Sequence, residues 1–135
     1  MLYVDSSAMM KRYKDEPNSE IALKYMNDDP VVVTSRLTEI EVRRNLALGF
    51  QGEQLNELKE RAKNDFDGLI VMNLDSRICE DAAVVAEETL CRSLDAVHVA
   101  AARGFGTGLR FLTFDKRQAS AARQMGLDVV DVEAA

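Results

Sequence analysis

The sequence has no tryptophan and one histidine, His98, and aromatic residues make up 6% of the chain. Its two cysteines, Cys79 and Cys91, have no second Cys or His pair at zinc-finger spacing. A single histidine is too few for a zinc site that uses several histidines, and it gives a Ser-His-Asp triad only one candidate base. We therefore expect reduced thiols, and we look for chemistry that needs neither histidine nor cysteine.

Long apolar runs are also missing. No stretch approaches the ~20 residues that span a bilayer, and the chain starts directly with the strand-like run Leu2–Val4 rather than with a basic and then an apolar segment. We therefore expect a cytoplasmic protein that does not enter membranes. With 135 residues, 47% apolar and 30% charged, the chain has the size and composition of one globular domain over residues 1–135.

Positive charge is scarce, with 17 Lys and Arg against 23 Asp and Glu, which gives a net charge of −6. A protein that binds nucleic acids generally carries a basic surface. A protein with this balance would need a basic surface confined to one region in order to bind RNA or DNA.

Strand-like and helix-like segments alternate along the chain. Short β-branched or apolar runs predict strands at 2–4, 31–33, 69–72, 111–113 and 129–130. Capping residues and helical spacing predict helices at 6–13, 17–27, 34–48, 53–67, 75–90, 93–102 and 116–125. This alternation is typical of an α/β fold with an open, largely parallel sheet that is covered on both faces.

Two aspartates directly follow predicted strands. Asp5 comes after Leu2–Val4, and Asp115 comes after the run 111–114. Ligands of open α/β sheets collect at the carboxyl ends of the strands, so these two carboxylates are candidates for a site. The alternative is that each aspartate only caps the helix that follows it.

Glu41 is placed by its angle on the helix predicted at 34–48. At about 100° per residue, one apolar stripe contains Leu37, Ile40, Ala47 and Leu48. Glu41 and Arg44 fall in or beside this stripe, whereas Glu39 points away from it. We therefore expect Glu41 to lean inward, either as a site residue or in an ion pair with Arg44.

Asp95 precedes a segment with no charge, residues 96–102. A helix that is apolar on all sides is buried. Asp95 lies in its first turn, where the helix dipole favours an anion. A buried carboxylate without a partner costs several kcal/mol. A capping hydrogen bond or a metal ion would offset that cost.

Together these four carboxylates, Asp5, Glu41, Asp95 and Asp115, predict a site for a divalent cation. Carboxylates brought close repel each other, and Mg²⁺ or Mn²⁺ relieves the repulsion through hard oxygen ligands. Such an ion can activate water and stabilise charge on a phosphate. Basic residues near the acids would form a rim that contacts RNA phosphates, unless they are ordinary surface charges. These residues are Lys11, Arg12, Arg43, Arg44, Arg92, Lys116 and Arg117.

Four segments carry a resemblance to a known family. They are Val4–Ala8, Thr34–Arg44, Leu94–Ala100 and Leu112–Arg117. In this order and at this spacing they resemble the PIN-domain family, and more narrowly the VapC toxins of prokaryotic toxin–antitoxin pairs. The resemblance covers essentially the whole chain.

The resemblance implies a Rossmann-like three-layer sandwich and a ribonuclease that depends on Mg²⁺ or Mn²⁺. The acids of its metal site would be Asp5, Glu41, Asp95 and Asp115, with the hydroxyls of Ser7 and Thr113 in support. His98 would pack or support the site rather than bind metal. The resemblance also implies an RNA substrate, a homodimer, and a cognate antitoxin that covers the site with its C-terminal segment.

Three alternatives remain at this point. A PIN nuclease could process RNA instead of acting as a toxin, and a PIN-like domain could bind RNA or protein without cutting. A phosphoacceptor module is also small, parallel and acidic at its strand ends, but it would carry an acidic pair after the first strand, where this chain has Asp5 followed by Ser6 and Ser7.

Overall fold

The computed structural model describes residues 1–133, which contain one parallel sheet. Its strands are β1 (Leu2–Val4), β2 (Val32–Ser35), β3 (Ile70–Met72), β4 (Arg110–Leu112) and β5 (Asp128–Val129). Within these residues five strands lie in the order β3-β2-β1-β4-β5, and every neighbouring pair is parallel. The expected fold class is therefore confirmed, and β1 takes the centre of the sheet.

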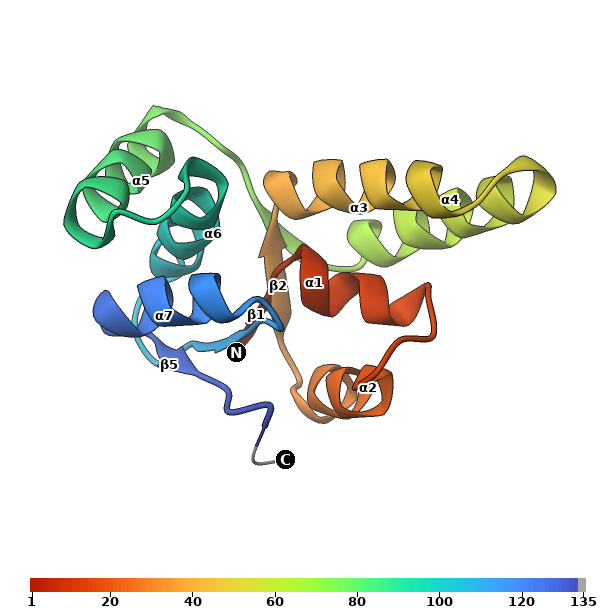
Figure 1. The fold of residues 1–135 in the computed structure, drawn as a ribbon, viewed down its shortest axis with the longest axis horizontal. Helices are drawn as coiled ribbons and strands as arrows, with labels where there is room; N and C mark the ends of the chain where they lie inside the picture. The colour runs from red at the N-terminus through yellow and green to blue at the C-terminus, as the bar shows by residue number, and fades with distance from the viewer. Residues whose placement is uncertain (134–135) are drawn as a thin grey trace.

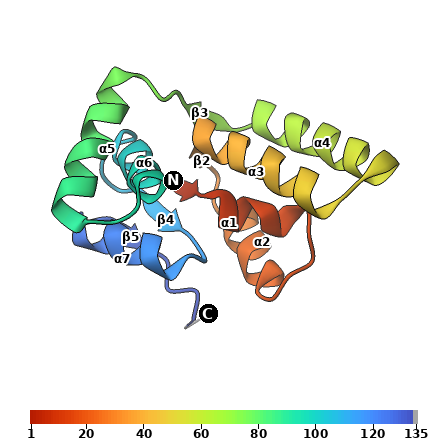
Figure 2. The same cartoon turned by 45° about the horizontal axis from the view of Figure 1, so that its top comes forward.

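Helices cover both faces of this sheet (Figure 1). They are α1 (Ser6–Met9), the short 3₁₀ helix η1 (Met10–Arg12), α2 (Ser19–Asp28), α3 (Arg36–Gly49), α4 (Gly52–Asp67), α5 (Ser76–Thr89), α6 (Ser93–Arg103) and α7 (Lys116–Gln124). In Figure 2, α5, α6 and α7 lie on one side and α1 to α4 on the other, with α3 and α4 side by side. No helix within residues 1–133 combines the length and apolar character needed to cross a membrane.

The alternation of β1 explains the two layers of helices. Leu2 and Val4 are fully buried in a core that they share with residues of α1 to α4. Tyr3, also fully buried, faces a second core with residues of α5, α6 and α7. Side chains of a strand point alternately to its two faces, so one three-residue strand contributes to both cores.

Two details of the sequence-based assignment are wrong. Pro17 does not begin a helix: α2 starts at Ser19, and Asn18 before it has a left-handed backbone with φ of 71°. On α3 the expected stripe is also misplaced, because Ile40 and Leu48 are 60% and 69% exposed. The buried face of α3 instead consists of Leu37, Thr38, Val42 and Leu46.

The position of β1 in the sheet determines where a binding site is expected. The chain moves from β1 outward to β2 and β3, and then returns to the other side of β1 with β4 and β5. Connections therefore diverge between β1 and β4, and ligands bind at such switch points, outside the carboxyl ends of the strands. Asp5 is the first residue after β1, and Thr113 is the first after β4.

Candidate active site

Asp5 lies at the centre of this edge and is 2% exposed. Its Oδ1 accepts hydrogen bonds from the Ser7 hydroxyl at 2.7 Å and the Ala8 backbone N–H at 2.9 Å. Its Oδ2 accepts from the Thr113 hydroxyl and from the side-chain amide of Gln118. Burial raises the pKa of Asp5, although a nearby histidine charge and these hydrogen bonds oppose the rise. Asp5 thus caps α1 and also binds the end of β4.

Gln118 is a site residue that the sequence analysis missed. It is 3% exposed, and its amide donates to Asp5 from the buried face of α7. The spacing held a signal, because Ala121 and Ala122 follow at three and four residues and share that buried face. A polar side chain on a buried face requires a hydrogen-bond partner.

Glu41 of α3 is tied to α1 and α6. Its Oε1 accepts a hydrogen bond from the Ser6 hydroxyl at 3.1 Å and lies 2.6 Å from Nε2 of His98. Within residues 1–133 the alternative of an ion pair with Arg44 is not seen, and Arg44 donates to Asn45 at 3.5 Å. His98, which is 2% exposed, thus contacts a candidate site residue directly.

Asp95 and Asp115 share one cation, the guanidinium of Arg92. Nε of Arg92 lies 3.1 Å from Oδ2 of Asp95, and Nη2 lies 3.3 Å from Oδ2 of Asp115. The hydrogen bond and charge of Asp95 raise the pKa of Arg92, and Asp115 adds to this effect. Asp95 is 5% exposed. Its carboxylate pairs with the guanidinium of Arg92 rather than with a backbone N–H group at the start of α6. Asp115 does cap α7, through hydrogen bonds that its Oδ1 accepts from the backbone N–H groups of Arg117 and Gln118.

These contacts link the acids in pairs. Neighbouring serines of α1 bond Glu41 and Asp5, and Arg92 joins the other two. Burial raises the pKa of Glu41 and the charge of Asp115 adds to that rise, but the hydrogen bond and charge of His98 outweigh both, so its pKa lies below the ordinary value. Within residues 1–133, no three His, Cys, Asp or Glu side chains form a set that could hold a metal ion as they stand.

The site nevertheless fits a hard cation in its donor chemistry. Carboxylate oxygens are the ligands that Mg²⁺ and Mn²⁺ take in proteins. Arg92 bridges Asp95 and Asp115, so oxygens of these two acids already converge on one positive charge. Asp95 and Asp115 thus form one carboxylate pair whose oxygens could hold a hard cation in place of the guanidinium.

Three of the seven expected rim residues lie together. Arg92, Lys116 and Arg117 line a hollow of about 410 Å³ beside Asp95. The remaining wall includes the polar side chains of Thr89, Ser120 and Gln124. These three expected rim residues therefore lie on the side of the acids that α6 and α7 form.

The expected rim residues Lys11 and Arg12 are engaged in contacts within the protein. The Lys11 ammonium donates to the backbone carbonyl of Pro17 at 2.8 Å and lies 4.9 Å from the centre of the Phe114 ring. Nε of Arg12 lies 3.4 Å from a carboxylate oxygen of Asp65. Both cations are thus directed to neighbouring groups of the protein.

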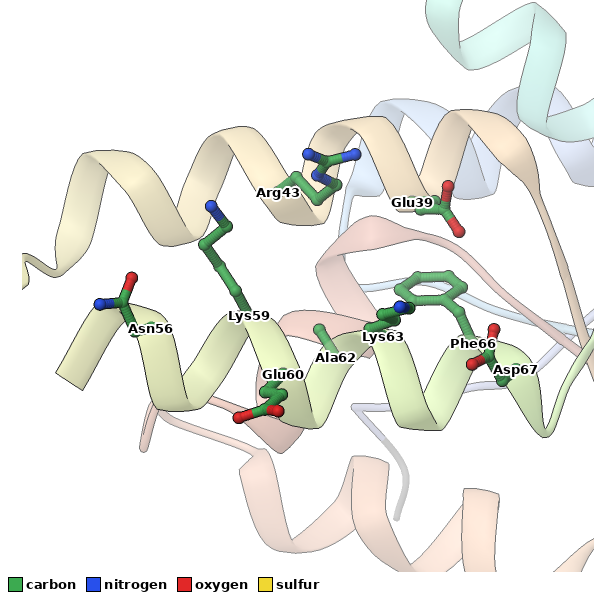
Figure 3. A pocket seen from close by; sticks show the side chains of 9 residues that line it. All are labelled: Glu39, Arg43, Asn56, Lys59, Glu60, Ala62, Lys63, Phe66 and Asp67. Carbon is green, nitrogen blue, oxygen red and sulfur yellow. The ribbon is translucent and has the colours of Figure 1, made fainter. Parts of the chain in front are cut away.

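Arg43 lies at a second hollow, away from the contacts that join the acids. This cavity, of about 500 Å³, lies between α3 and α4, and Figure 3 shows Arg43 and Glu39 on α3 above the ring of Phe66 on α4. Glu39 pairs with Arg36 at 3.4 Å. Glu39 and Glu41 therefore have different partners although their side chains are similarly exposed, at 31% and 27%. Arg43 is separate from the basic hollow beside Asp95.

A model of the PIN-domain family matches residues 2–124, so the chain belongs to the PIN-domain family. Within it, the chain is similar to Ribonuclease VapC46 of Mycobacterium tuberculosis, with 34% identity over 96% of this chain and 95% of that protein. The fold is similar to FitAcB from Neisseria gonorrhoeae, with a TM-score of 0.79, 21% identity and 100% of both chains covered. It is also similar to a toxin–antitoxin complex from Klebsiella pneumoniae, with a TM-score of 0.75, 16% identity and 98% of both chains covered.

Proposed function

We propose that this protein is a VapC-type endoribonuclease that uses Mg²⁺ or Mn²⁺ and acts as the toxin of a toxin–antitoxin pair. The observation that carries the proposal is that Asp5 and Asp115 follow β1 and β4 at the switch point, and that Arg92 links Asp115 to the buried Asp95. The likeness to Ribonuclease VapC46 supports RNA as the substrate. Because the proposed substrate is RNA, we expect the protein to act in the cytoplasm.

Different side chains have different roles in the proposed reaction. Asp5, Glu41, Asp95 and Asp115 hold the cation, which when bound lowers the pKa of water and offsets charge on the phosphate. Ser7 and Thr113 keep the Asp5 carboxylate in place through the hydrogen bonds described above.

The basic hollow beside Asp95 binds the RNA backbone. Arg92, Lys116 and Arg117 supply positive charge there, and phosphate contacts of this kind set the position of an RNA strand without reading its sequence. Of the other expected rim residues, Lys11, Arg12, Arg43 and Arg44 belong to a wider surface that longer RNAs would contact.

The purified chain, incubated with total cellular RNA, tests the activity. We expect new 5′ ends when Mg²⁺ or Mn²⁺ is present and none when EDTA removes the metal. Asp5→Asn and Asp95→Asn are expected to abolish the cleavage. Unchanged cleavage by either variant would contradict the role given to that carboxylate, and cleavage in EDTA would contradict metal dependence.

The proposal also includes two protein partners. The Klebsiella structure is of a toxin–antitoxin complex, which supports a small antitoxin that restrains this chain. Overexpression alone should arrest growth, whereas coexpression with the gene encoded beside it should restore growth and yield a stable complex. We further propose a homodimer, to be measured by light scattering. Harmless overexpression of a protein that cleaves RNA in the tube would favour a role in RNA processing instead.

A further inference from the structure

A chain of hydrogen bonds runs from the buried sheet to Glu41. The Tyr3 hydroxyl donates to the Ser35 hydroxyl at 2.9 Å and lies 3.0 Å from Nδ1 of His98. On the other side of the ring, Nε2 of His98 lies 2.6 Å from Oε1 of Glu41. The imidazole of His98 therefore has a partner at each ring nitrogen. The Tyr3 hydroxyl lies at Nδ1, and the Glu41 carboxylate lies at Nε2.

Tyr3 is itself held firmly in the core. It is fully buried, and its ring stacks on Phe111 of β4 with centroids 5.2 Å apart and planes 5° apart. The edge of the His98 ring meets it at 6.1 Å and 75°. Packed interiors allow little movement, so the Tyr3 hydroxyl is a fixed reference point for His98.

Glu41 is the side chain whose orientation depends most on this fixed position of His98. It has a long flexible side chain that is 27% exposed, and both of its hydrogen bonds within residues 1–133, from Ser6 and His98, involve Oε1. This leaves Oε2 as the oxygen that would face a ligand. Without His98, the Glu41 side chain would lose more conformational freedom each time that it takes up its working position, which costs free energy.

We propose that Tyr3 and His98 are positioning residues that orient Glu41 for the reaction. This inference rests on the proposed function. Neither residue touches RNA, because Tyr3 is fully buried and His98 is 2% exposed. Their effect therefore passes through Glu41 and falls on kcat rather than on KM for RNA.

Three variants remove the contacts of Tyr3 and His98 to different extents. Tyr3→Phe removes one hydroxyl and keeps the ring. His98→Gln removes the contact with Tyr3 but keeps an amide donor near the place of Nε2, whereas His98→Leu removes both contacts. We expect kcat to fall by about tenfold to 100-fold in His98→Leu, with partial recovery in His98→Gln. Tyr13→Phe is the matched control, because it removes a hydroxyl bond to Asp65 at 2.7 Å that is unconnected with Glu41.

A double-mutant cycle separates positioning from general damage. In a Glu41→Gln background, Tyr3→Phe and His98→Leu should cause no further loss of kcat, because the group through which they act is already changed. Additive losses in the cycle, or equal losses for Tyr3→Phe and Tyr13→Phe, would overturn the proposal.

A second readout does not need activity. His98 is the single histidine of the sequence, so its ring nitrogens give unambiguous NMR signals. We expect Tyr3→Phe to move the Nδ1 resonance and Glu41→Gln to move the Nε2 resonance. If the wild type cleaves no RNA and these shifts occur, the proposed function fails and the His98 contacts stand. If the wild type cleaves RNA and neither variant moves a His98 resonance, the positioning role is refuted.

Discussion

Nε of Arg92 lies 3.1 Å from Oδ2 of Asp95, three residues further along the chain. The same guanidinium reaches Asp115, so one side chain pairs with two of the four carboxylates. A guanidinium and a divalent cation cannot both occupy these oxygens. Arg92 is therefore an internal competitor of the metal that the site is proposed to bind.

The variant Arg92→Gln should bind Mn²⁺ several-fold more tightly than the wild type. The competing charge is gone, and both carboxylates are free to bind the ion. Isothermal titration calorimetry measures the change. Arg117→Gln is the control, since it removes the same charge from the same hollow without breaking a contact with Asp95. Equal affinities for the two variants would show that Arg92 does not compete directly.

Asp5→Asn should stabilise the metal-free protein at neutral pH. Burial raises the pKa of Asp5 in the folded chain, so this group costs stability increasingly as the pH rises above the ordinary pKa of an aspartate, and the cost is complete at the raised value. Below the ordinary pKa of an aspartate, the group is protonated in both states and the cost disappears. Thermal unfolding in EDTA should therefore show a higher Tm for the variant at pH 7 and no difference in strong acid. A lower Tm at pH 7 would contradict this sign.

The opposite pH dependence is expected of Glu41. His98 lowers the pKa of Glu41, so this carboxylate contributes stability above its ordinary pKa, and the contribution is lost as the pH falls through the lower, folded value. Over the acid range, the Tm of the wild type should fall more steeply than that of Glu41→Gln. Parallel curves for the two proteins would contradict the contribution of this pair.

Gln118→Leu should lower the free energy of unfolding by about 2 kcal/mol, because a buried carboxylate loses a charge-assisted hydrogen bond. Urea unfolding monitored by circular dichroism gives the value. Gln124→Leu changes an exposed glutamine of the same helix, whose partner is Ser120 at 3.3 Å, and should change stability by less than about 0.5 kcal/mol. Similar losses in both variants would argue that the effect comes from helix propensity.

Charge reversal should locate the RNA. In an Asp95→Asn background that binds without cutting, Arg117→Glu should weaken binding of a short RNA and reduce its dependence on salt concentration. Arg43→Glu, beside the hollow between α3 and α4, should leave binding of the same RNA nearly unchanged. Fluorescence anisotropy over a range of salt concentrations measures both. The opposite ranking would place the RNA on the face that α3 forms.

Much of the architecture could be read from local patterns. Short β-branched runs alternating with capped helices indicate a parallel sheet, and an uncharged helix after Asp95 indicates burial. These signals lie within a few residues of each other, which is why sequence reasoning finds them. The stripe on α3 failed because Thr38 and Val42 face the core, whereas Ile40 is 60% exposed. Tertiary packing decides which face of such a helix is buried.

The partners of the acids were harder to foresee. Gln118 lies 113 residues from Asp5, and His98 lies 57 residues from Glu41. No local spacing encodes such contacts, since Asp5 meets Gln118 when the sheet order brings β4 beside β1, and Glu41 meets His98 where α3 packs on α6. Arg92 was expected to contact phosphate and keeps that role in the proposal, but its pairing with Asp95, three residues further along, was not foreseen.

The central place of β1 has a consequence for synthesis. β1 can pair with β4 only after residues 110–112 have been made, and Asp5 can bond Thr113 only after another 108 residues have followed it. Until then its carboxylate lacks half of its hydrogen bonds, and the chain still lacks Asp115. A chain terminated before residue 115 therefore lacks Asp115 and cannot assemble the four acids.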